Sequence, residues 1–229
     1  MAKKQDIKTG YVVKHIVGSL LFLAILFISA GKFYYWQGLT YLAVGIVMTL
    51  LNYTVFRVDP ELLEERSGSR PGTKQWDKVI LALLSLATIA MYILAGLDSG
   101  RHHWSPAFPP ILYFVGITLT IIGQLLFLIA QKQNSFFSST VRIQTDRQHT
   151  VCEEGLYAFV RHPAYLGFII QLIGFPIMFA SIWSIIPVTV SIVLFIIRTE
   201  LEDKTLREEL PGYVEYSKKI RFKIIPGIW

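Results

Sequence analysis

The side chains best suited to chemistry lie together in residues 155–167, which read Gly-Leu-Tyr-Ala-Phe-Val-Arg-His-Pro-Ala-Tyr-Leu-Gly. This segment contains two tyrosines, an arginine and a histidine, namely Tyr157, Tyr165, Arg161 and His162. Pro163 then opens the longest uncharged run in the chain, and proline suits the first position of a helix, where its missing N–H needs no partner. Since a helix start carries unpaired N–H groups and a partial positive charge, it can hold an anion. The segment therefore predicts either an interfacial cap for a membrane helix or a binding site.

A second candidate group follows the uncharged run. Arg198 and Glu202 are four residues apart and share one face of the predicted helix. Taken alone, they predict an interfacial ion pair with a snorkelling arginine, worth less than about 1 kcal/mol. Beside the first group, Arg198 can orient a carboxylate or phosphate, and Glu202 can bind an amine or hydroxyl. The tyrosine faces of the first group favour cations, including a sulfonium.

The composition indicates an integral membrane protein. Of the 229 residues, 53% are hydrophobic and 17% are charged, whereas a soluble domain carries about 25% charged residues. The single cysteine, Cys152, excludes an intramolecular disulfide and a cysteine-cluster metal site. Because the adjacent His102 and His103 are expected to be exposed loop residues, no metal is expected. Basic residues flank apolar runs instead of forming a basic, aromatic-rich surface, so no nucleic-acid partner is expected either.

About six membrane-embedded helices are predicted, which makes the fold all-α and polytopic. Four of them lie in residues 1–131, at 16–31, 33–56, 79–97 and from 110 to 131. The first also resembles a cleavable signal peptide, but further spans follow at once. Four aromatic residues, Phe33 to Trp36, are typical of the headgroup level of a bilayer. Gly116 and Gly123 lie on one helix face and would let a neighbouring helix approach closely.

The last two helices are predicted to form a tight hairpin in residues 163–197. This run has no charge, and as one helix it would be about 52 Å long, against about 30 Å for a hydrocarbon core. Two spans that turn near residues 180–184 resolve the excess length. Pro176 and Pro187 are expected to kink the two arms and leave room for a ligand.

The charge distribution predicts the orientation of these spans. With six spans, 20 of the 22 Lys and Arg residues fall on the side of the N-terminus, and only Lys32 and Arg101 fall on the other side. The positive-inside rule therefore predicts that both termini are cytoplasmic. Residues 132–162 and 198–223 then lie on the same face and can meet. We expect residues 1–131 and the core of residues 132–229 to form a single integrated domain.

The two candidate groups resemble a known family. The pattern Gly155-x-Tyr157-x-x-x-Arg161-His162-Pro163-x-Tyr165-x-Gly167 resembles the signature of the isoprenylcysteine carboxyl methyltransferase family, whose superfamily includes the phospholipid N-methyltransferases. Arg198-Thr-Glu-Leu-Glu202 with Leu206, followed by Gly212-Tyr213-x-x-Tyr216, is similar to its second block, and residues 221–226 to its closing segment. The resemblance covers roughly residues 130–226. Small departures are Glu153-Glu154, Leu156 where proline is frequent, and Asp203 in place of a frequent glutamate.

The resemblance implies an enzyme like protein-S-isoprenylcysteine O-methyltransferase, with S-adenosylmethionine in a pocket on the cytoplasmic face. It also implies a lipophilic methyl acceptor that enters from the bilayer between helices, in contact with membrane lipids. Arg198 and Glu202 match the catalytic pair, with Arg198 facing the substrate. The residues that match the cofactor contacts are Gln144, His149, Thr150, Val151, Cys152, Tyr157, His162, Pro163, Ala164, Tyr165 and Glu202.

The chemistry of methyl transfer favours a carboxylate acceptor. Transfer is an in-line displacement, so the enzyme supplies alignment and excludes water. A carboxylate is ionised at neutral pH and needs no base, whereas an amine needs one, and Glu202 or His162 would have to serve. No dedicated base stands out, which favours carboxyl O-methylation.

Three alternatives stay open. The closest is a phospholipid or small-amine N-methyltransferase with the same cofactor site. A second is an NADPH-dependent, sterol-type membrane reductase, although the chain has no Gly-x-Gly-x-x-Gly motif. The third is a structural or transport bundle, which the near absence of ionisable residues from the spans disfavours.

Overall fold

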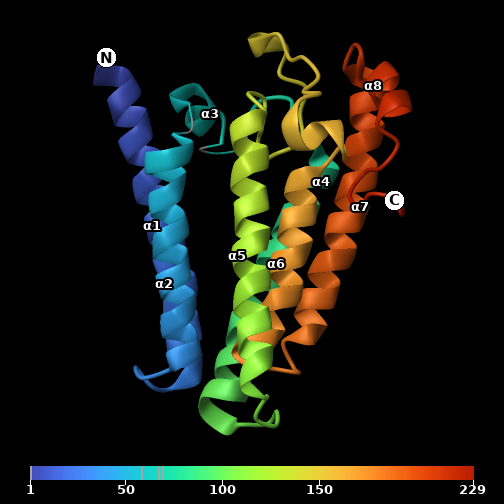
Figure 1. The fold of residues 1–229 in the computed structure, drawn as a ribbon. Coiled ribbons are helices and arrows are strands. Elements are labelled where there is room, and N and C mark those ends of the chain that lie inside the picture. Colours follow the sequence, from blue (N-terminus) through green and yellow to red (C-terminus); the bar gives the residue numbers. More distant parts are fainter. Residues whose placement is uncertain (1, 58, 67, 69) are drawn as a thin grey trace.

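A computed structural model describes residues 2–57, 59–66, 68 and 70–229 (Figure 1). The side chains of residues 2–8 and of Pro60 lie outside this description, and with them those of Lys3, Lys4 and Lys8 in the basic N-terminal segment. All regular structure in the described residues is helical. The α-helices are α1 (Ala2–Ala30), α2 (Trp36–Leu51), α3 (Pro60–Glu65), α4 (Gln75–Ala95), α5 (Pro110–Gln133), α6 (Pro163–Phe179), α7 (Ile185–Glu209) and α8 (Tyr213–Lys219).

The long helices run side by side, and their polar connections gather at one end (Figure 1). The N-terminus, α3, the connection of residues 134–162 and α8 all lie at that end. Four helical segments are long and apolar enough to cross a membrane, namely Thr9–Ala30, Trp36–Phe56, Gln75–His102 and Pro110–Gln133. They match the four spans predicted for the first part of the chain. The all-helical, membrane-spanning class of fold is therefore confirmed.

The predicted hairpin is formed by α6 and α7. α6 begins at Pro163, and the chain turns at residues 180–184, where Ala180 takes a left-handed conformation with φ 49°. Pro187 lies in the first turn of α7, where proline removes no helical hydrogen bond, while Pro176 lies inside α6. Neither proline lines the large pocket described below. Residues from both arms of the hairpin nevertheless line that pocket, and a contribution of kinks to its space stays a prediction.

Glycines allow α5 and α6 to touch backbone to backbone. A Cβ atom at Gly123 of α5 would lie 2.5 Å from the carbonyl oxygen of Gly167 in α6, and one at Gly116 would lie 2.3 Å from the backbone nitrogen of Met178. Real Cβ contacts are essentially never shorter than 3.0 Å. The predicted close approach at these two glycines is confirmed, and it fixes α6 firmly against α5.

The glycine contact gives a first prediction. Gly123→Ala should lower thermal stability, because overpacking of this kind costs typically about 1–3 kcal/mol. Thermal unfolding in detergent, followed by tryptophan fluorescence, measures the loss. Gly45→Ala in α2 is the control, since its Cβ would meet nothing within 4 Å and alanine favours a helix. Equal melting temperatures for the two variants would contradict the packing.

The opposite end of the bundle differs from the prediction in two places. Phe33 and Tyr34 are about nine-tenths exposed, as expected of interfacial aromatics, but Tyr35 is buried and its hydroxyl lies 2.6 Å from that of Ser99. The expected polar turn at residues 98–103 instead continues α4 as a wider helical turn, Gly96–His102. Asp98 in this turn is fully buried and accepts hydrogen bonds from Ser105 and from Ser181 in the hairpin turn. This carboxylate therefore ties α4 to the α6–α7 hairpin.

Candidate active site

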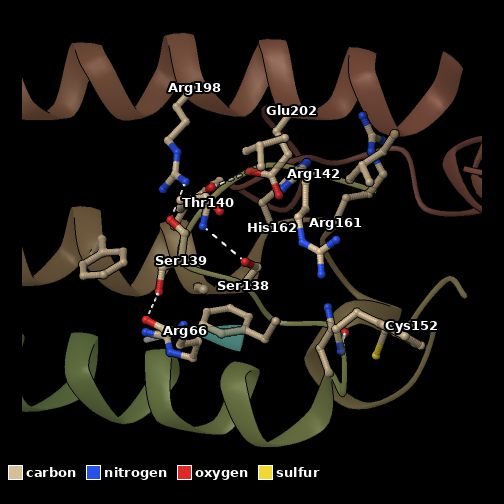
Figure 2. Close-up of a pocket in the computed structure, with 18 of the residues that line it drawn as sticks. Arg66, Ser138, Ser139, Thr140, Arg142, Cys152, Arg161, His162, Arg198 and Glu202 are labelled. Atoms are coloured by element: carbon tan, nitrogen blue, oxygen red, sulfur yellow. Dashed lines mark hydrogen bonds between the residues drawn. The ribbon is translucent and has the colours of Figure 1, made fainter. Parts of the chain in front are cut away.

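A pocket of about 430 Å³ lies where the connection of residues 134–162 meets α7 and α8. Figure 2 shows Arg198 and Glu202 on α7 along one wall, with Arg66 and Cys152 on the other side of the space. The apolar part of the lining comes from α4 to α7, with Leu81, Leu84, Phe127, Phe168 and Phe195. The volume lies within the range of about 300–1,000 Å³ typical of small-molecule sites.

The structure brings the predicted site residues together. The residues that line this pocket include Gln144, His149, Thr150, Val151, Cys152, Tyr157, His162, Ala164, Tyr165, Arg198 and Glu202. Pro163 does not line the pocket, because it is the first residue of α6 and acts through the backbone. Residues separated by more than fifty positions in the chain thus share one cavity.

The start of α6 is held by the C-terminal segment. The backbone N–H groups of Arg161 and His162 donate to the carbonyls of Phe222 and Lys223, at 3.0 and 2.8 Å. The Nη1 group of Arg161 donates to two further carbonyls, of Ile220 and Arg221. No side chain caps this helix. The two residues that precede α6 therefore hold the C-terminal segment beside the pocket.

Asp203 is the centre of a buried polar network behind this segment. Arg161 donates to its two carboxylate oxygens at 2.7 and 3.0 Å, and the Tyr213 hydroxyl donates at 2.9 Å. His162 Nε2 lies 3.5 Å from the same carboxylate. Burial alone would raise the pKa of Asp203, but the hydrogen bonds from His162 and Arg161 outweigh it and hold the pKa well below its usual value. Asp203 is therefore a carboxylate at physiological pH, and it links α7 to the start of α6.

Arg198 does not pair with Glu202, so the predicted ion pair was wrong. Arg198 Nε donates to Asp77 at 2.7 Å, and its Nη2 donates to the carbonyl of Ser139 at 3.0 Å. The other oxygen of Asp77 accepts from the backbone N–H of Val141 at 2.8 Å. Asp77 is fully buried, and a buried arginine satisfies such a carboxylate better than an exposed pairing along one helix would. Glu202 instead accepts a short hydrogen bond from the hydroxyl of Tyr165.

Asp77 is the functional-site residue that sequence reasoning missed. It lies in the first turn of α4, and its partner is 121 residues away. The predicted span began at residue 79, which left Asp77 in a polar loop where a carboxylate needs no explanation. Extending the apolar helix by one turn would have marked it as an acid entering a buried helix, which requires a partner.

Gln144 and His149 shape the loop that closes the pocket. The Gln144 side chain is buried, donates to the carbonyl of Phe136 at 2.7 Å and accepts from Arg147 at 2.6 Å. His149 stacks near Phe136, with ring centres 4.6 Å apart. Burial, followed by the positive charges of Arg142 and Arg147, lowers the pKa of His149 to about 4. The imidazole is therefore neutral at physiological pH.

The lowered pKa of His149 gives a pH prediction. The unfolded state binds a proton near pH 6.5 and the folded state only near pH 4. Stability contributed by His149 is therefore present above about pH 6.5 and lost as the pH falls toward 4. Melting temperatures of the wild type and His149→Gln, measured from pH 7 to pH 4.5, should converge or cross as the pH falls. A difference that is constant over this window would contradict the neutral, buried imidazole.

Comparison with known proteins points to one family. Residues 114–208 match the model of the isoprenylcysteine carboxyl methyltransferase (ICMT) family. A probable protein-S-isoprenylcysteine O-methyltransferase of Oryza sativa subsp. indica is 29% identical over 146 residues, which cover 59% of this chain and 76% of the rice protein. The protein-S-isoprenylcysteine O-methyltransferase of Saccharomyces cerevisiae is 30% identical over 114 residues, 46% of each chain.

A solved structure agrees in fold. The eukaryotic intramembrane Ras methyltransferase ICMT matches 95% of this chain and 86% of its own with a TM-score of 0.51, at 16% sequence identity. The residues that match the family model include the whole 155–167 segment, Arg198 and Glu202, whereas Asp77 lies outside them. Over part of its length the chain is therefore similar to the isoprenylcysteine carboxyl methyltransferase family, which supports a methyltransferase, and its fold agrees with that of a solved member of this family.

Proposed function

We propose that the chain transfers the methyl group of S-adenosylmethionine to the carboxylate of an isoprenylcysteine-like or other lipophilic acceptor. The observation that carries this proposal is the state of Glu202. Its carboxylate lines the pocket and accepts from Tyr165, and within the described residues it forms no salt bridge. A carboxylate that accepts from a tyrosine and forms no salt bridge, beside a pocket with apolar walls, is suited to a cationic ligand.

The pocket residues fit S-adenosylmethionine, which supplies a methyl group activated by a sulfonium. Glu202 would bind a positive group of this cofactor, and Tyr157 offers an aromatic face that favours cations. The Tyr165 ring already lies against the Arg198 guanidinium and the His162 ring, so Tyr165 is proposed to act through its hydrogen bond to Glu202. The other residues proposed to hold it are Gln144, His149, Thr150, Val151, Cys152, His162, Pro163 and Ala164. Among these, Gln144 would act by fixing the loop, since its amide is already bonded at both ends.

The apolar part of the pocket suits the acceptor's hydrocarbon. Leu84 and Phe168 lie in membrane-embedded helices, and Phe22 of α1 reaches the same cavity. We propose that the acceptor enters from the bilayer between these helices and meets the cofactor near α7. A reaction that neutralises a carboxylate is favoured where water is excluded, as the acceptor's hydrocarbon would do on filling the apolar part of the pocket.

Arg198 is proposed to orient the acceptor's reacting end. Two of its guanidinium nitrogens donate hydrogen bonds to Asp77 and to the carbonyl of Ser139, which fixes the plane of the guanidinium group. Its Nη1 group forms no hydrogen bond within the described part of the chain and can donate to the acceptor. Since the charge of Arg198 is balanced by Asp77, its proposed role is alignment.

Carboxyl methylation is favoured over amine methylation because Glu202 is already assigned to the cofactor and His162 contacts Asp203. Glu202 already accepts from Tyr165, and His162 lies within the Asp203 network. An amine acceptor would have to lose its proton to one of these groups. The carboxylate acceptor needs no such step.

The proposal includes the topology. We propose six membrane-embedded helices, with both termini and the active site on the cytoplasmic face. The pocket is at the end of the bundle that carries the N-terminus and α8, the side on which the positive-inside rule puts most Lys and Arg residues. Residues 1–131 and 132–229 are proposed to form one domain, which is supported by Asp77 of α4 binding Arg198 of α7.

Transfer of a labelled methyl group to an S-farnesylcysteine derivative tests the role of Arg198. Arg198→Ala should abolish transfer, while the affinity for S-adenosylhomocysteine should change little. Because alanine leaves Asp77 unpaired, Arg198→Lys is the second variant. It keeps the charge but loses the planar fork, so transfer should fall at least about tenfold in a folded protein. Full transfer by both variants, or loss of cofactor binding with the fold intact, would refute this role.

A further inference from the structure

Some of the charged side chains that line the pocket form salt bridges and others do not. This difference bears on which acceptor the pocket selects, an inference that rests on the proposed function. Four arginines line the cavity: Arg66, Arg142, Arg161 and Arg198. Three of them are held by carboxylates. Arg142 binds Glu65 and Asp146, Arg161 binds Asp203, and Arg198 binds Asp77, each at 2.7 or 2.8 Å.

Arg66 differs from the other three. Within the described part of the chain, no carboxylate lies within salt-bridge distance of it. Its guanidinium carbon lies 4.9 Å from the ring centre of Phe137 and 5.6 Å from that of Phe127. Its Nε donates to the hydroxyl of Tyr11 at 3.3 Å. The guanidinium is therefore partly desolvated by aromatic rings, and its charge is not neutralised.

The surroundings of Arg66 add polar groups without adding negative charge. His15 stacks on Tyr11 and lies edge-on to Tyr53, with ring centres 6.4 Å apart in both pairs. The hydroxyl of Tyr53 is buried and has no hydrogen-bond partner in the described residues. Tyr11, His15 and Tyr53 do not line the pocket, so the Arg66 guanidinium is the charged group that this region presents to the cavity.

Hydrogen bonds of the Arg66 backbone and of the neighbouring Glu65 keep Arg66 in this position. Its backbone carbonyl accepts from the Ser139 hydroxyl at 3.3 Å, and the preceding residue, Glu65, binds Arg142 of the same loop through two hydrogen bonds. Figure 2 shows Arg66 on the side of the pocket away from Arg198, with Ser139 between them. The loop that carries Ser139 therefore contacts both arginines.

Two lining groups, Glu202 and Arg66, thus form no salt bridge within the described part of the chain. Glu202 is negative and suits the cationic cofactor, which leaves one positive charge for the acceptor. The Arg198–Asp77 ion pair has no net charge, so it attracts an acid only weakly. Arg66 has no paired carboxylate and therefore attracts an acid through a net positive charge. An amine acceptor would be repelled by the same charge.

We propose that Arg66 is a specificity-determining residue that favours an anionic acceptor through the electrostatic attraction of its guanidinium, which no carboxylate of the described residues pairs with. Arg198 then aligns the reacting end, and Arg66 supplies the net charge that distinguishes an acid from a neutral or cationic lipid. Arg66 lies outside residues 114–208, which match the family model, so the selectivity is encoded by the connection between α2 and α4.

The test compares two probes that differ only in charge, N-acetyl-S-farnesylcysteine and its carboxamide. Binding of each is titrated to the full-length protein saturated with S-adenosylhomocysteine, in nanodiscs of phosphatidylcholine, so that no turnover occurs. The wild type should prefer the acid by about tenfold or more, as attraction to a guanidinium without a paired carboxylate implies. Arg66→Gln should raise the Kd of the acid to that of the carboxamide and leave the carboxamide unchanged, whereas Arg66→Lys should retain part of the preference.

Arg70→Gln is the matched control. Arg70 lies four residues further along the same connection, pairs with Glu64 and does not line the pocket, so this variant should keep the wild-type preference. A preference that survives Arg66→Gln overturns the proposal, and so does equal affinity of the wild type for the two probes, including no binding of either.

Lipid composition distinguishes an acceptor oxyanion from a lipid headgroup. Addition of phosphatidylserine to the nanodiscs should leave the Kd of the acid unchanged. A rise in Kd that Arg66→Gln abolishes would assign the site to bulk lipid and overturn the proposal. S-adenosylhomocysteine binding is measured first: its absence in the wild type rejects the proposed function itself, while intact binding with an unchanged preference in Arg66→Gln rejects only the role of Arg66.

Discussion

Replacing Asp77 by alanine is expected to destabilise the protein by about 3–5 kcal/mol, the usual result of breaking a buried ion pair by removing one partner. The substitution leaves Arg198 as an uncompensated charge that is only 6% exposed, and it frees the backbone N–H of Val141. Because Asp77 joins α4, α7 and the loop of residues 138–142, its loss should also release the wall of the pocket. Thermal unfolding in detergent measures the first effect, and methyl transfer measures the second.

Two other substitutions make this prediction specific. Asp77→Asn keeps the shape and one acceptor oxygen, so it should be less destabilising than alanine while still impairing transfer. Glu208→Ala removes an exposed partner of Lys204 on the same helix as Arg198 and should change stability by less than about 1 kcal/mol. If Asp77→Ala is as mild as Glu208→Ala, Asp77 does not organise the site.

Replacing Asp203 by alanine should have an effect of similar size, about 3–5 kcal/mol. This carboxylate binds Arg161 through two hydrogen bonds, accepts from Tyr213 and pairs with Arg207 at 3.0 Å. Arg161 in turn holds the carbonyls of Ile220 and Arg221, so the C-terminal segment should loosen together with the start of α6. Thermal unfolding and limited proteolysis of the tail measure the two effects.

Asp203→Glu is the informative comparison for that network. Glutamate keeps the charge with one more methylene group, so it should recover most of the stability and keep the tail protected. A tail that is cleaved equally fast in the wild type and in Asp203→Ala would show that Asp203 does not hold it.

The sequence was most informative about features that depend on a few neighbouring residues. Pro163 at the start of α6, the hairpin turn at residues 180–184 and the glycine face of α5 follow from helix capping, from length and from steric contact, and each is present in the structure. Motif resemblance likewise identified the residues of the 144–165 region and of α7 that share the pocket.

Long-range pairing was not predictable in the same way. Arg198 and Glu202 have the spacing of an ion pair along one helix face. Arg198 instead forms its ion pair with the buried carboxylate of Asp77 in α4. Tyr35 is buried because its hydroxyl reaches Ser99 and Ala95 in the adjacent α4 segment, which the aromatic cluster alone does not indicate. Such choices depend on which groups three-dimensional packing leaves without water, and sequence spacing carries no information about them.

The central claim is that Glu202 helps to hold S-adenosylmethionine in this pocket. Calorimetric titration of the purified protein with S-adenosylhomocysteine, run beside NADPH and repeated for Glu202→Ala, tests it most directly. We expect micromolar binding of S-adenosylhomocysteine, weakened at least about tenfold by Glu202→Ala, and no binding of NADPH. Binding of NADPH alone, or an affinity for S-adenosylhomocysteine that Glu202→Ala leaves unchanged, would contradict it.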